Sequence, residues 1–373
     1  MQIPLTKPFL SQAVKDQVNQ VLDSGFWTEG ATTKALEERI GDYLDAQSTL
    51  AVCNCTVGLE IALRALGVSS GDEVIVPDYT YPATAAAALL TGANVTLVDV
   101  DPTTMLVNYQ ALEAAITPKT KAIIPVSLFG NPLDYNELHR LRDKYGFAIV
   151  EDAACALGAR FQDKFVGTLA DITVFSLHPR KFITTGEGGI ITTDNKQWAE
   201  WMDRYKHFGI SREATTPENL FTMVGGNYKL SNLQAAVGLA QMTMVQELLA
   251  ERRKMATRYQ TLLDGMPGIT LPKTTANCEH SYQTFTVFVD DRNQLMQRVR
   301  EHGVEVQIGT YSLHMQPAFR NHPRCRQAGE LTGSTFAFNH CLALPLYPGM
   351  NEEEQDTVIN TLRKASGAQP CVA

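Results

Sequence analysis

The sequence lacks the features of proteins that depend on paired cysteines, a basic surface or a structural metal. Its 7 cysteines are an odd number. They include no CxxC pair and no His/Cys cluster at zinc spacing, so we expect reduced thiols and no metal site. The formal net charge of -8 argues against a nucleic-acid partner, because phosphate backbones favour a clustered basic face.

Long apolar runs are also missing. No stretch approaches the roughly 20 residues needed to span a bilayer, and the first residues, Met1 to Phe9, lack the apolar core of a signal peptide. The junction Asn54 to Gly58 does not read G-x-G-x-x-G, so the fingerprint of a dinucleotide-dependent oxidoreductase is absent. We expect a cytoplasmic protein with no membrane and no nucleic-acid partner.

From about residue 49 to 193, short apolar runs alternate with helical patterns such as Leu59 to Leu66 and Leu133 to Tyr145. This alternation predicts an α/β fold with a mainly parallel sheet covered by helices. Ligands of such sheets bind beyond the carboxyl ends of the strands. The expected strands are Thr49 to Val52, Glu73 to Pro77, Asn94 to Val98, Ala122 to Val126, Ala148 to Glu151, Ile172 to Phe175 and Ile190 to Thr193.

A second, smaller domain is predicted after a long helical pattern from about Ser231 to Leu263. The breaker Gly265-Met-Pro-Gly268 ends that pattern, and alternation resumes in Ser281 to Val289. We expect an N-terminal segment at 1–30, a large domain at 31–245 and a small domain at 246–373 that includes the long helix. The small domain should also contain a helix near Arg292 to Glu301, a strand near Val304 to Ile308 and a final helix from about Glu352 to Lys364.

The most informative segment is Phe175-Ser-Leu-His-Pro-Arg-Lys-Phe-Ile-Thr-Thr-Gly-Glu-Gly-Gly189. It places Lys181 in the loop leaving a buried strand, where a lysine can form a Schiff base. Asp152 ends another predicted strand, so both side chains should emerge at one sheet edge. Such a pair suits pyridoxal phosphate (PLP), because the carboxylate pairs with the pyridinium nitrogen while the lysine forms an imine. From spacing alone, a helix cap at Asp152 and a surface ion pair at Lys181 are equally acceptable.

A phosphate site is predicted where Asn54-Cys-Thr-Val-Gly58 joins a strand to a helix. The Thr56 hydroxyl and nearby N–H groups would face an anion at the helix N-terminus, although an ordinary helix cap explains a lone threonine more simply. Ser176 is a second candidate phosphate ligand. Tyr81 follows another strand end, where its ring could lie flat against a planar cofactor, but core packing explains a lone tyrosine better.

Taken together, these segments resemble the DegT/DnrJ/EryC1/StrS family of PLP-dependent sugar aminotransferases, a branch of the fold-type I, aspartate aminotransferase-like enzymes. The resemblance covers nearly the whole chain. It implies a large domain with a mainly parallel seven-stranded sheet flanked by helices, and a smaller C-terminal α/β domain. The matching segments are Ser24-Gly-Phe-Trp-Thr-Glu-Gly30, Gly71-Asp-Glu-Val-Ile-Val-Pro77, Glu151-Asp-Ala-Ala154, the lysine segment, Gly226-Asn-Tyr-Lys-Leu230 and Leu344-Pro-Leu-Tyr-Pro-Gly349.

By this resemblance, Lys181 is the Schiff-base lysine and Asp152 the pyridinium partner. Thr56 and Ser176 are phosphate ligands, and Tyr81 is the aromatic residue that stacks on the ring. Lys181 would also move a proton during catalysis, which requires a lysine that loses its proton near neutral pH. Sugar dehydratases of this group carry histidine at the lysine position, so Lys181 argues against that activity.

Two cofactor-site positions depart from the family pattern. Cys155 stands where the family usually has His or Gln, and a thiol cannot make the same strong hydrogen bond to the cofactor. Cys55 replaces the usual glycine or alanine before the phosphate-binding threonine, so the backbone there does not need a glycine-only conformation. We expect PLP binding to survive both changes.

The resemblance also implies a homodimer with shared active sites, because the asparagine that matches Asn227 reaches the phosphate of the neighbouring subunit. The N-terminal segment is expected to contribute to the site and to the dimer. Lys229 is a candidate contact for substrate phosphates, with a solvated charge as the alternative. Tyr311 and His314 belong to a segment that borders the sugar site and are candidate substrate contacts, with a packed histidine as the alternative.

The activity implied is transfer of an amino group, from glutamate, to a keto-sugar. The leading acceptor is a nucleotide-linked 4-keto- or 3-keto-deoxyhexose, as used in amino-sugar and polysaccharide biosynthesis such as that of lipopolysaccharide O-antigen. An octulosonate-type sugar without a nucleotide is the alternative acceptor. A non-catalytic regulatory protein of the same fold is a further alternative, which the presence of Asp152, Ser176 and Lys181 disfavours.

Overall fold

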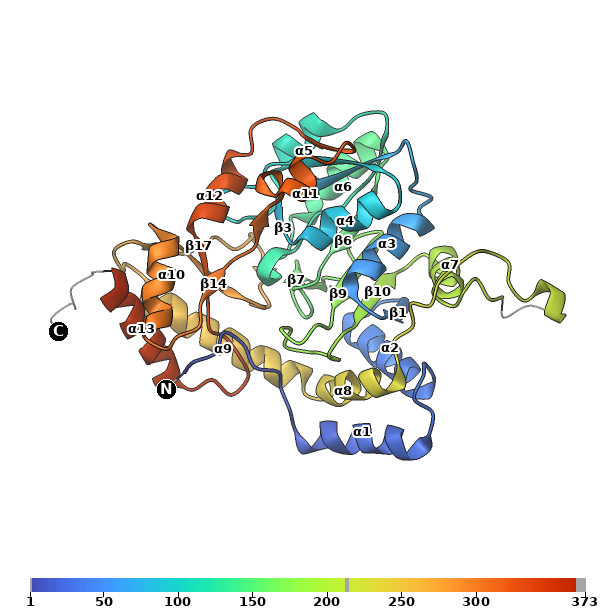
Figure 1. The fold of residues 1–373 in the computed structure, drawn as a ribbon, viewed down its shortest axis with the longest axis horizontal. Coiled ribbons are helices and arrows are strands. Elements are labelled where there is room, and N and C mark those ends of the chain that lie inside the picture. The colour runs from blue at the N-terminus through green and yellow to red at the C-terminus, as the bar shows by residue number, and fades with distance from the viewer. Residues whose placement is uncertain (1, 212–214, 367–373) are drawn as a thin grey trace.

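The computed structural model describes residues 2–211 and 215–366 and centres on an eight-stranded sheet (Figure 1). The strand order is β1-β10-β9-β6-β5-β2-β4-β16. Strand β10 runs antiparallel to its neighbours β1 and β9, and the other neighbouring strands are parallel. The strands are β1 (Ser48–Val52), β2 (Glu73–Pro77), β4 (Asn94–Val98), β5 (Thr120–Ile123), β6 (Ala148–Asp152), β9 (Ile172–Ser176), β10 (Gly189–Thr193) and β16 (Cys325–Gln327).

The predicted mainly parallel sheet is confirmed, with one strand more than the seven expected. The addition is β16, which pairs with β4 at the sheet edge through the register Cys325↔Val95. Its sequence is short and polar, so it carries no strand signal of its own. Strand β5 is shorter than expected at its carboxyl end, because Pro125 has no N–H for the ladder.

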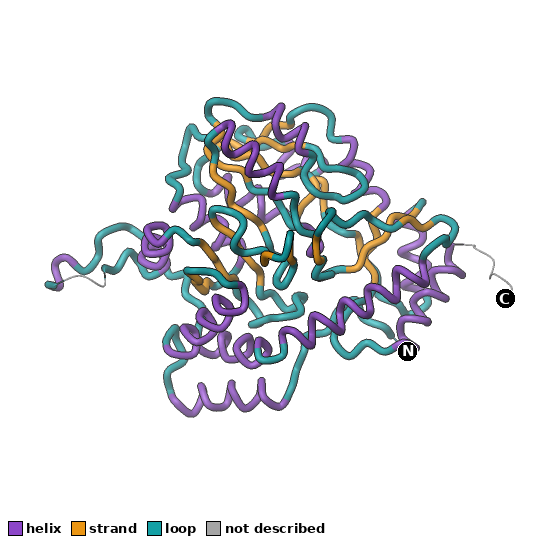
Figure 2. Tube along the Cα trace, turned by 180° about the vertical axis from the view of Figure 1, so that it is seen from behind, coloured by secondary structure: helices purple, strands orange, loops and turns teal. Residues whose placement is uncertain are grey.

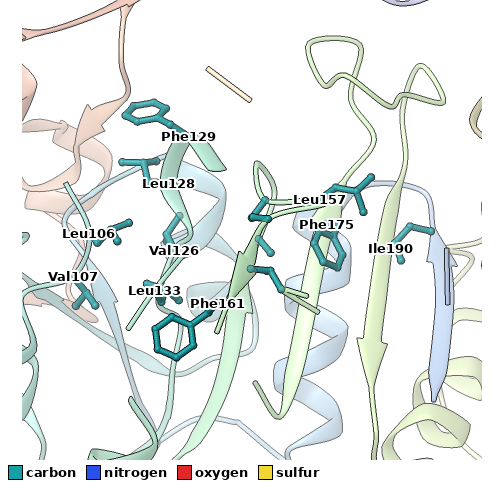
Figure 3. Packing of buried hydrophobic residues seen from close by; sticks show 14 of the residues in the cluster. Leu106, Val107, Val126, Leu128, Phe129, Leu133, Leu157, Phe161, Phe175 and Ile190 are labelled. Atoms are coloured by element: carbon teal, nitrogen blue, oxygen red, sulfur yellow. The ribbon is translucent and has the colours of Figure 1, made fainter. Parts of the chain in front are cut away.

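Side chains of the central strands alternate between two buried clusters, one on each face of the sheet. Along β2, Val74 and Val76 belong to one cluster and Ile75 to the other. The cluster that contains Ile75 is shown in part in Figure 3. The Val74 face is covered by α3 (Cys55–Ala65), α4 (Pro82–Leu90) and α7 (Lys196–Lys206), and the Ile75 face by α2 (Ala31–Leu44), α5 (Tyr109–Ala115), α6 (Tyr135–Tyr145) and α8 (Asn232–Met242).

A third buried cluster forms the core of the smaller part of the molecule, around a four-stranded sheet of order β11-β13-β17-β14. Ile3 belongs to this core and its N–H donates to Gly303 O at 2.8 Å, so the start of the chain is built into it. The elements are β11 (Ile269–Thr270), β13 (Phe285–Val289), β14 (Gln307–Ile308), β17 (Cys341–Leu344), α9 (Val245–Leu263), α10 (Arg292–Glu301) and α13 (Glu352–Ser366).

The long helix expected from Ser231 to Leu263 is two helices, α8 and α9, which separate at Thr243 and Met244. Helix α1 (Gln12–Ser24) packs along α8 (Figure 1). The described parts of the chain between α7 and Asn227, residues 207–211 and 215–226, extend away from the body of the molecule in both views and form a projecting segment (Figures 1 and 2). Among the described residues, no helix has the combination of length and apolar character needed to cross a membrane.

The chain after β14 returns to the large sheet and packs at the edge where the parallel strands have their carboxyl ends. Strand β15 (Tyr311–Ser312) pairs with β3 (Tyr79–Thr80) just beyond the end of β2. This pairing brings a segment from the C-terminal part next to the predicted stacking tyrosine. The remaining elements are β7 (Arg160–Phe161), β8 (Lys164–Phe165), β12 (Cys278–Glu279), α11 (Pro317–Arg320), α12 (Thr332–His340) and the short 3-10 helices η1 (Leu128–Gly130), η2 (Pro217–Asn219) and η3 (Leu313–Met315).

Candidate active site

Lys181 lies in the loop that follows β9, where the sequence placed it. Its N–H donates to His178 O at 2.8 Å, and its Nζ lies 3.0 Å from Cys155 Sγ. Burial lowers the pKa of Lys181, but the nearby Cys155, Cys55 and Asp152 raise it by more, so the pKa is raised overall. The raised pKa favours the charged ammonium, which is opposite to the expected lysine that loses its proton near neutral pH.

Two glutamines hold the backbone of this loop. Gln283, just before β13, accepts a hydrogen bond from Phe182 N–H at 3.1 Å and donates one to Arg180 O at 2.7 Å. Gln241 of α8 accepts from Thr184 N–H at 2.7 Å. The peptide groups on both sides of Lys181 are thus fixed by one side chain from the small sheet. No pattern in the sequence predicts either glutamine.

Asp152 ends β6 and points its carboxylate at the same edge of the sheet. It is 4% exposed and accepts hydrogen bonds from Thr84 Oγ1 at 2.7 Å and Ala154 N–H at 3.2 Å. Burial raises the pKa of Asp152, while the bonds from Thr84 and Ala154 and the charge of Lys181 lower it, and the pKa is raised overall. Among the described residues, Asp152 forms no ion pair. A buried carboxylate without a counter-ion fits a protonated ring nitrogen.

Of the predicted phosphate ligands, Thr56 lies at the start of α3 and Ser176 at the end of β9. Asn54 caps this helix by accepting from Val57 N–H at 2.9 Å, and Thr56 lies in its first turn. Gly189 of β10 packs beneath the cap: a Cβ there would lie 2.8 Å from the Asn54 carbonyl carbon. Gly189 is also the register partner of Ser176. The close approach that glycine permits therefore packs β10, the strand paired with Ser176, beneath the first turn of α3, in which Thr56 lies.

Both cysteines that depart from the family pattern lie in this site. Cys55 begins α3, and burial, followed by the charge of Asp152, raises its pKa well above the usual range. It therefore stays a neutral thiol at physiological pH. Cys155 contacts Lys181 through sulfur and accepts from Ser281 Oγ at 3.0 Å through its carbonyl. The 6 described cysteines form no disulfide, and Cys371 lies outside the described residues.

The predicted stacking residue, Tyr81, lies beside Tyr311, a predicted substrate contact. Tyr81 precedes α4, is 64% exposed, and its ring centre lies 6.3 Å from that of Tyr311. Tyr79, two residues earlier, is instead buried, and its hydroxyl accepts from Thr310 N–H at 3.2 Å. Of Tyr79 and Tyr81, the exposed Tyr81 is thus the one that is open to a ligand. Strand β15 brings Tyr311 beside it.

His314 is a packed histidine whose charge is set by a buried carboxylate. Its backbone N–H and its Nδ1 lie 2.8 Å and 2.6 Å from the two oxygens of Asp78, which is fully buried. The hydrogen bond to Asp78 raises the pKa of His314 more than burial lowers it. His314 is therefore the packed histidine that was the alternative to a substrate contact, because its Nδ1 is engaged by Asp78. The same hydrogen bond favours the charged form of the imidazole.

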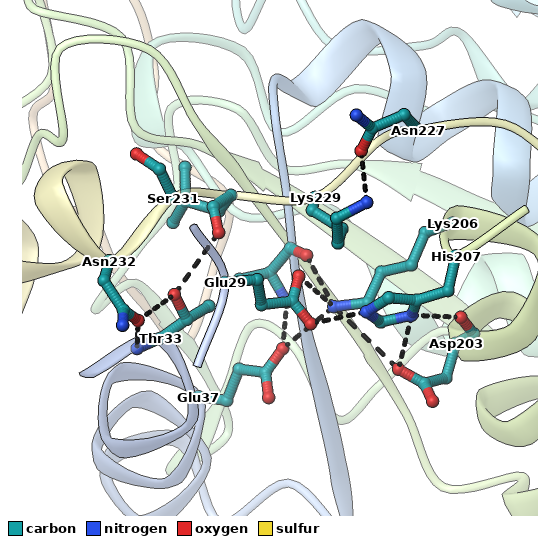
Figure 4. A network of polar contacts seen from close by, with 12 residues as sticks. Glu29, Thr33, Glu37, Asp203, Lys206, His207, Asn227, Lys229, Ser231 and Asn232 are labelled. Carbon is teal, nitrogen blue, oxygen red and sulfur yellow. Dashed lines mark hydrogen bonds and ion pairs between the residues drawn. The ribbon is translucent and has the colours of Figure 1, made fainter. Parts of the chain in front are cut away.

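Asn227 and Lys229 lie on the strand-like segment that returns from the projecting loop. Lys229 Nζ donates to Asn227 Oδ1, and Asn227 is exposed (Figure 4). Within one chain, the segment runs alongside the end of β1, where Cys53 N–H donates to Tyr228 O at 2.8 Å. This is the strand that leads to the cap of α3. The expected reach of Asn227 into a neighbouring subunit stays a prediction.

A buried ion cluster anchors the base of that projecting segment (Figure 4). Lys206 is 1% exposed, and its Nζ lies 3.2 Å from Glu29 and 3.3 Å from Glu37. His207 Nε2 lies 2.8 Å from Glu29. Glu29, Asp203 and His207 have spacing that could hold a metal ion, but the Lys206 ammonium already supplies the positive charge between these carboxylates. The cluster ties α7 to the Ser24–Gly30 segment.

The comparison with known families identifies one matching family model. Residues 9–363 match the DegT/DnrJ/EryC1/StrS aminotransferase family. This match confirms the resemblance found in the sequence, and it covers both sheets and the whole candidate site.

Solved structures of similar fold support the same assignment. The aminotransferase TlmJ from Streptoalloteichus hindustanus is 28% identical with a TM-score of 0.92, and the match covers 99% of this chain and 100% of that one. DesV from S. venezuelae is 29% identical with a TM-score of 0.90, covering 99% and 100%. The PLP form of Spr1654 from Streptococcus pneumoniae is 29% identical with a TM-score of 0.91, covering 98% and 99%.

Proposed function

Because this chain belongs to the DegT/DnrJ/EryC1/StrS aminotransferase family, whose members use pyridoxal phosphate, we propose that it transfers an amino group from glutamate to a nucleotide-linked keto-sugar. The observation that carries the proposal is the convergence of Lys181 and the unpaired, buried Asp152 at one sheet edge. A lysine and a carboxylate in this arrangement suit an amine-transfer cofactor.

The residues at the sheet edge divide the work of holding that cofactor. Asp152 would hold the protonated ring nitrogen, Thr56 and Ser176 with the start of α3 would hold the phosphate, and Tyr81 offers a ring face. Bound there, pyridoxal phosphate would supply a carbonyl carbon that takes up the donor's nitrogen and a ring that withdraws electrons from the adjacent carbon. Lys181 Nζ would take and return the proton.

Positive charge near the mouth of the site supports an anionic acceptor. Lys229, held by the exposed Asn227, supplies this charge, whereas the imidazolium that the raised pKa of His314 favours is balanced by the buried Asp78. A nucleotide-linked 4-keto- or 3-keto-deoxyhexose brings a diphosphate that this charge attracts. An octulosonate-type acid is the second candidate, because the same positive charge would attract its carboxylate. Either product would enter amino-sugar and polysaccharide biosynthesis, such as that of lipopolysaccharide O-antigen.

A homodimer with shared sites is part of the proposal. Exposed apolar side chains gather near the ends of α1 and on the segment after α7, including Phe26 at 76%, Phe221 at 61% and Val224 at 94% exposure. Such side chains on a projecting segment mark an association surface. A second copy that covers them would place Asn227 against the phosphate end of its neighbour's site. We place the enzyme in the cytoplasm, where nucleotide-linked sugars are made.

The direct test loads the enzyme with pyridoxamine phosphate and offers it a panel of keto-sugars, with and without a nucleotide. The expected result is that a nucleotide-linked 4-keto- or 3-keto-deoxyhexose restores the absorbance of the PLP form, and that glutamate reverses the change. If no keto-sugar restored it while glutamate still bleached the PLP form, the donor half would stand and the acceptor would be rejected. The Lys181→Ala variant is the control that should show neither change.

A further inference from the structure

Arg180, the residue before Lys181, has a fixed backbone and an exposed side chain. Its N–H donates to His178 Nδ1 at 3.3 Å, and its carbonyl accepts from Gln283 Nε2 at 2.7 Å. The turn is closed by the 2.8 Å bond from Lys181 N–H to His178 O. These bonds hold the root of the Arg180 side chain at a set place beside the reactive lysine.

A small cavity adjoins Arg180, with walls from the lysine loop, the N-terminal segment and the small sheet. Its volume is about 90 Å³, below the several hundred cubic ångströms of a pocket that encloses a whole drug-sized ligand. It therefore suits one end of a small molecule, such as a carboxylate on a short aliphatic chain. The lining residues that matter here are Thr6, Arg180, Gln283, Thr284, Gln307 and the apolar Leu346.

The Arg180 guanidinium has hydrogen-bond donors to spare. Of its N–H groups, Nη1 makes one long bond, 3.4 Å to Gln307 Oε1. Across the described ranges 2–211 and 215–366, no carboxylate lies within ion-pair distance of Arg180. Most other arginines near this site are engaged: Arg252, for example, donates to the carbonyls of Tyr282 and Gln283. A planar fork of free donors is the group that best recognises a carboxylate in two-point fashion.

We propose that Arg180, assisted by Gln307, binds a carboxylate of the amino donor; this inference rests on the proposed function. The donor must bring its amino nitrogen to the neighbourhood of Lys181 Nζ, and an amino acid carries its α-carboxylate on the same carbon as that nitrogen. A dicarboxylic donor carries a second carboxylate farther along its chain. An anchor on the adjacent residue orients such a molecule, and the small cavity disfavours a nucleotide diphosphate as its occupant.

The test uses PLP-loaded enzyme and glutarate, a dicarboxylate that has no amino group and cannot react. Calorimetry measures the glutarate Kd of the wild type, Arg180→Met, which removes the charge, and Arg180→Lys, which keeps the charge but loses the fork. The matched control is Lys254→Met, which removes a positive charge from an exposed position of α9. Uridine diphosphate is the phosphate probe. The thermal midpoint of each variant checks folding, which the exposed Arg180 side chain should not affect.

The expected result is that Arg180→Met raises the glutarate Kd by roughly ten- to hundredfold, the range of a lost charge-assisted pair. Arg180→Lys should fall between, and Lys254→Met should match the wild type. Unchanged glutarate affinity in Arg180→Met, or no glutarate binding by the wild type, would overturn the inference. So would a loss of uridine diphosphate affinity instead. The proposed donor is tested separately: it fails if glutamate leaves the absorbance of the wild-type PLP form unchanged.

Discussion

Asp152 is held in place by two hydroxyl groups in series. Thr84 Oγ1 lies 2.7 Å from the carboxylate and 2.9 Å from Thr80 Oγ1, and both threonines are buried. The Oδ2 atom of Asp152 is thereby fixed, and its position sets the direction in which Oδ1 points. At this scale the site is a buried charge whose orientation depends on hydroxyl donors from a neighbouring strand end and helix.

We predict that Thr84→Val weakens cofactor binding by roughly tenfold or more, because a buried charge loses a hydrogen bond. The Thr84 bond lowers the pKa of Asp152, so its loss raises that pKa further above the usual range. On acidification, the variant should therefore release PLP at a higher pH than the wild type does. Equilibrium dialysis of PLP across pH measures this effect. Thr84→Ser keeps the hydroxyl and should behave like the wild type.

Lys181, Asp152, Thr56 and Ser176 could be predicted from the sequence because each follows or ends a strand, and strand ends of a parallel sheet meet at one edge. Thr84, Gln283 and Asp78 could not. Their partners lie far away along the chain, and a lone threonine, glutamine or aspartate has no periodic pattern that announces such a contact.

At the scale of elements, the backbone of the lysine loop is hydrogen-bonded by side chains from two different parts of the fold. Gln283 comes from the segment before β13 in the small sheet, and Gln241 comes from α8 under the large sheet. The carbonyl of Gln283 in turn accepts from the buried Arg252 of α9 at 3.2 Å. The backbone on both sides of Lys181 is therefore linked through Gln283 to the segment before β13 and to α9.

We predict that Gln283→Leu lowers kcat by about tenfold and also raises KM for the amino donor, because it frees the peptide groups beside the lysine and the backbone of Arg180. Single-turnover kinetics with the donor alone measure the effect. Gln241→Leu is the matched control: it also removes buried hydrogen bonds, at a similar cost of about 2 kcal/mol in stability, but away from Lys181. An equal fall in kcat in both variants would show a general loosening of the loop instead.

At the scale of the whole molecule, the large sheet and the three buried clusters follow from alternation of apolar residues, which the sequence displays directly. The return of residues 311–340 to the large sheet does not, because β15 and β16 are short and partly polar. Such edge pairings depend on packing partners that come together only in the folded chain. The division between α8 and α9 could not be predicted either, because the apolar pattern continues across the break.

The shared site of the proposed dimer is tested by mixing two inactive variants. Lys181→Ala and Asn227→Ala are each expected to lose activity, and re-equilibrated mixtures should form hybrids with one intact site. Random pairing then restores about a quarter of the wild-type activity, since half of the dimers are hybrids and each has one working site. Each variant alone serves as the control. Full activity of Asn227→Ala alone, or no recovery on mixing, would contradict a site completed by the second copy.

We predict that the stability of the fold depends on pH through the buried Glu151. Burial raises the pKa of Glu151 to about 7, although the hydroxyls of Ser127, Tyr135 and Thr173 lower it. The folded state therefore holds a proton that the unfolded state releases near pH 4.5. The unfolding free energy should fall, by up to about 3 kcal/mol, as pH rises from roughly 4.5 to 7. Denaturant unfolding of the wild type and Glu151→Gln measures this, and the variant should lack that component of the slope.

The assignment of Lys181 as the residue that carries the cofactor is tested most directly by borohydride reduction of the PLP-loaded wild type. Reduction makes the bond between PLP and its lysine permanent, and peptide mass spectrometry then locates the pyridoxyl group. This group is expected on Lys181. A pyridoxyl group on another lysine, or none after reduction of protein shown to contain PLP, would contradict the account.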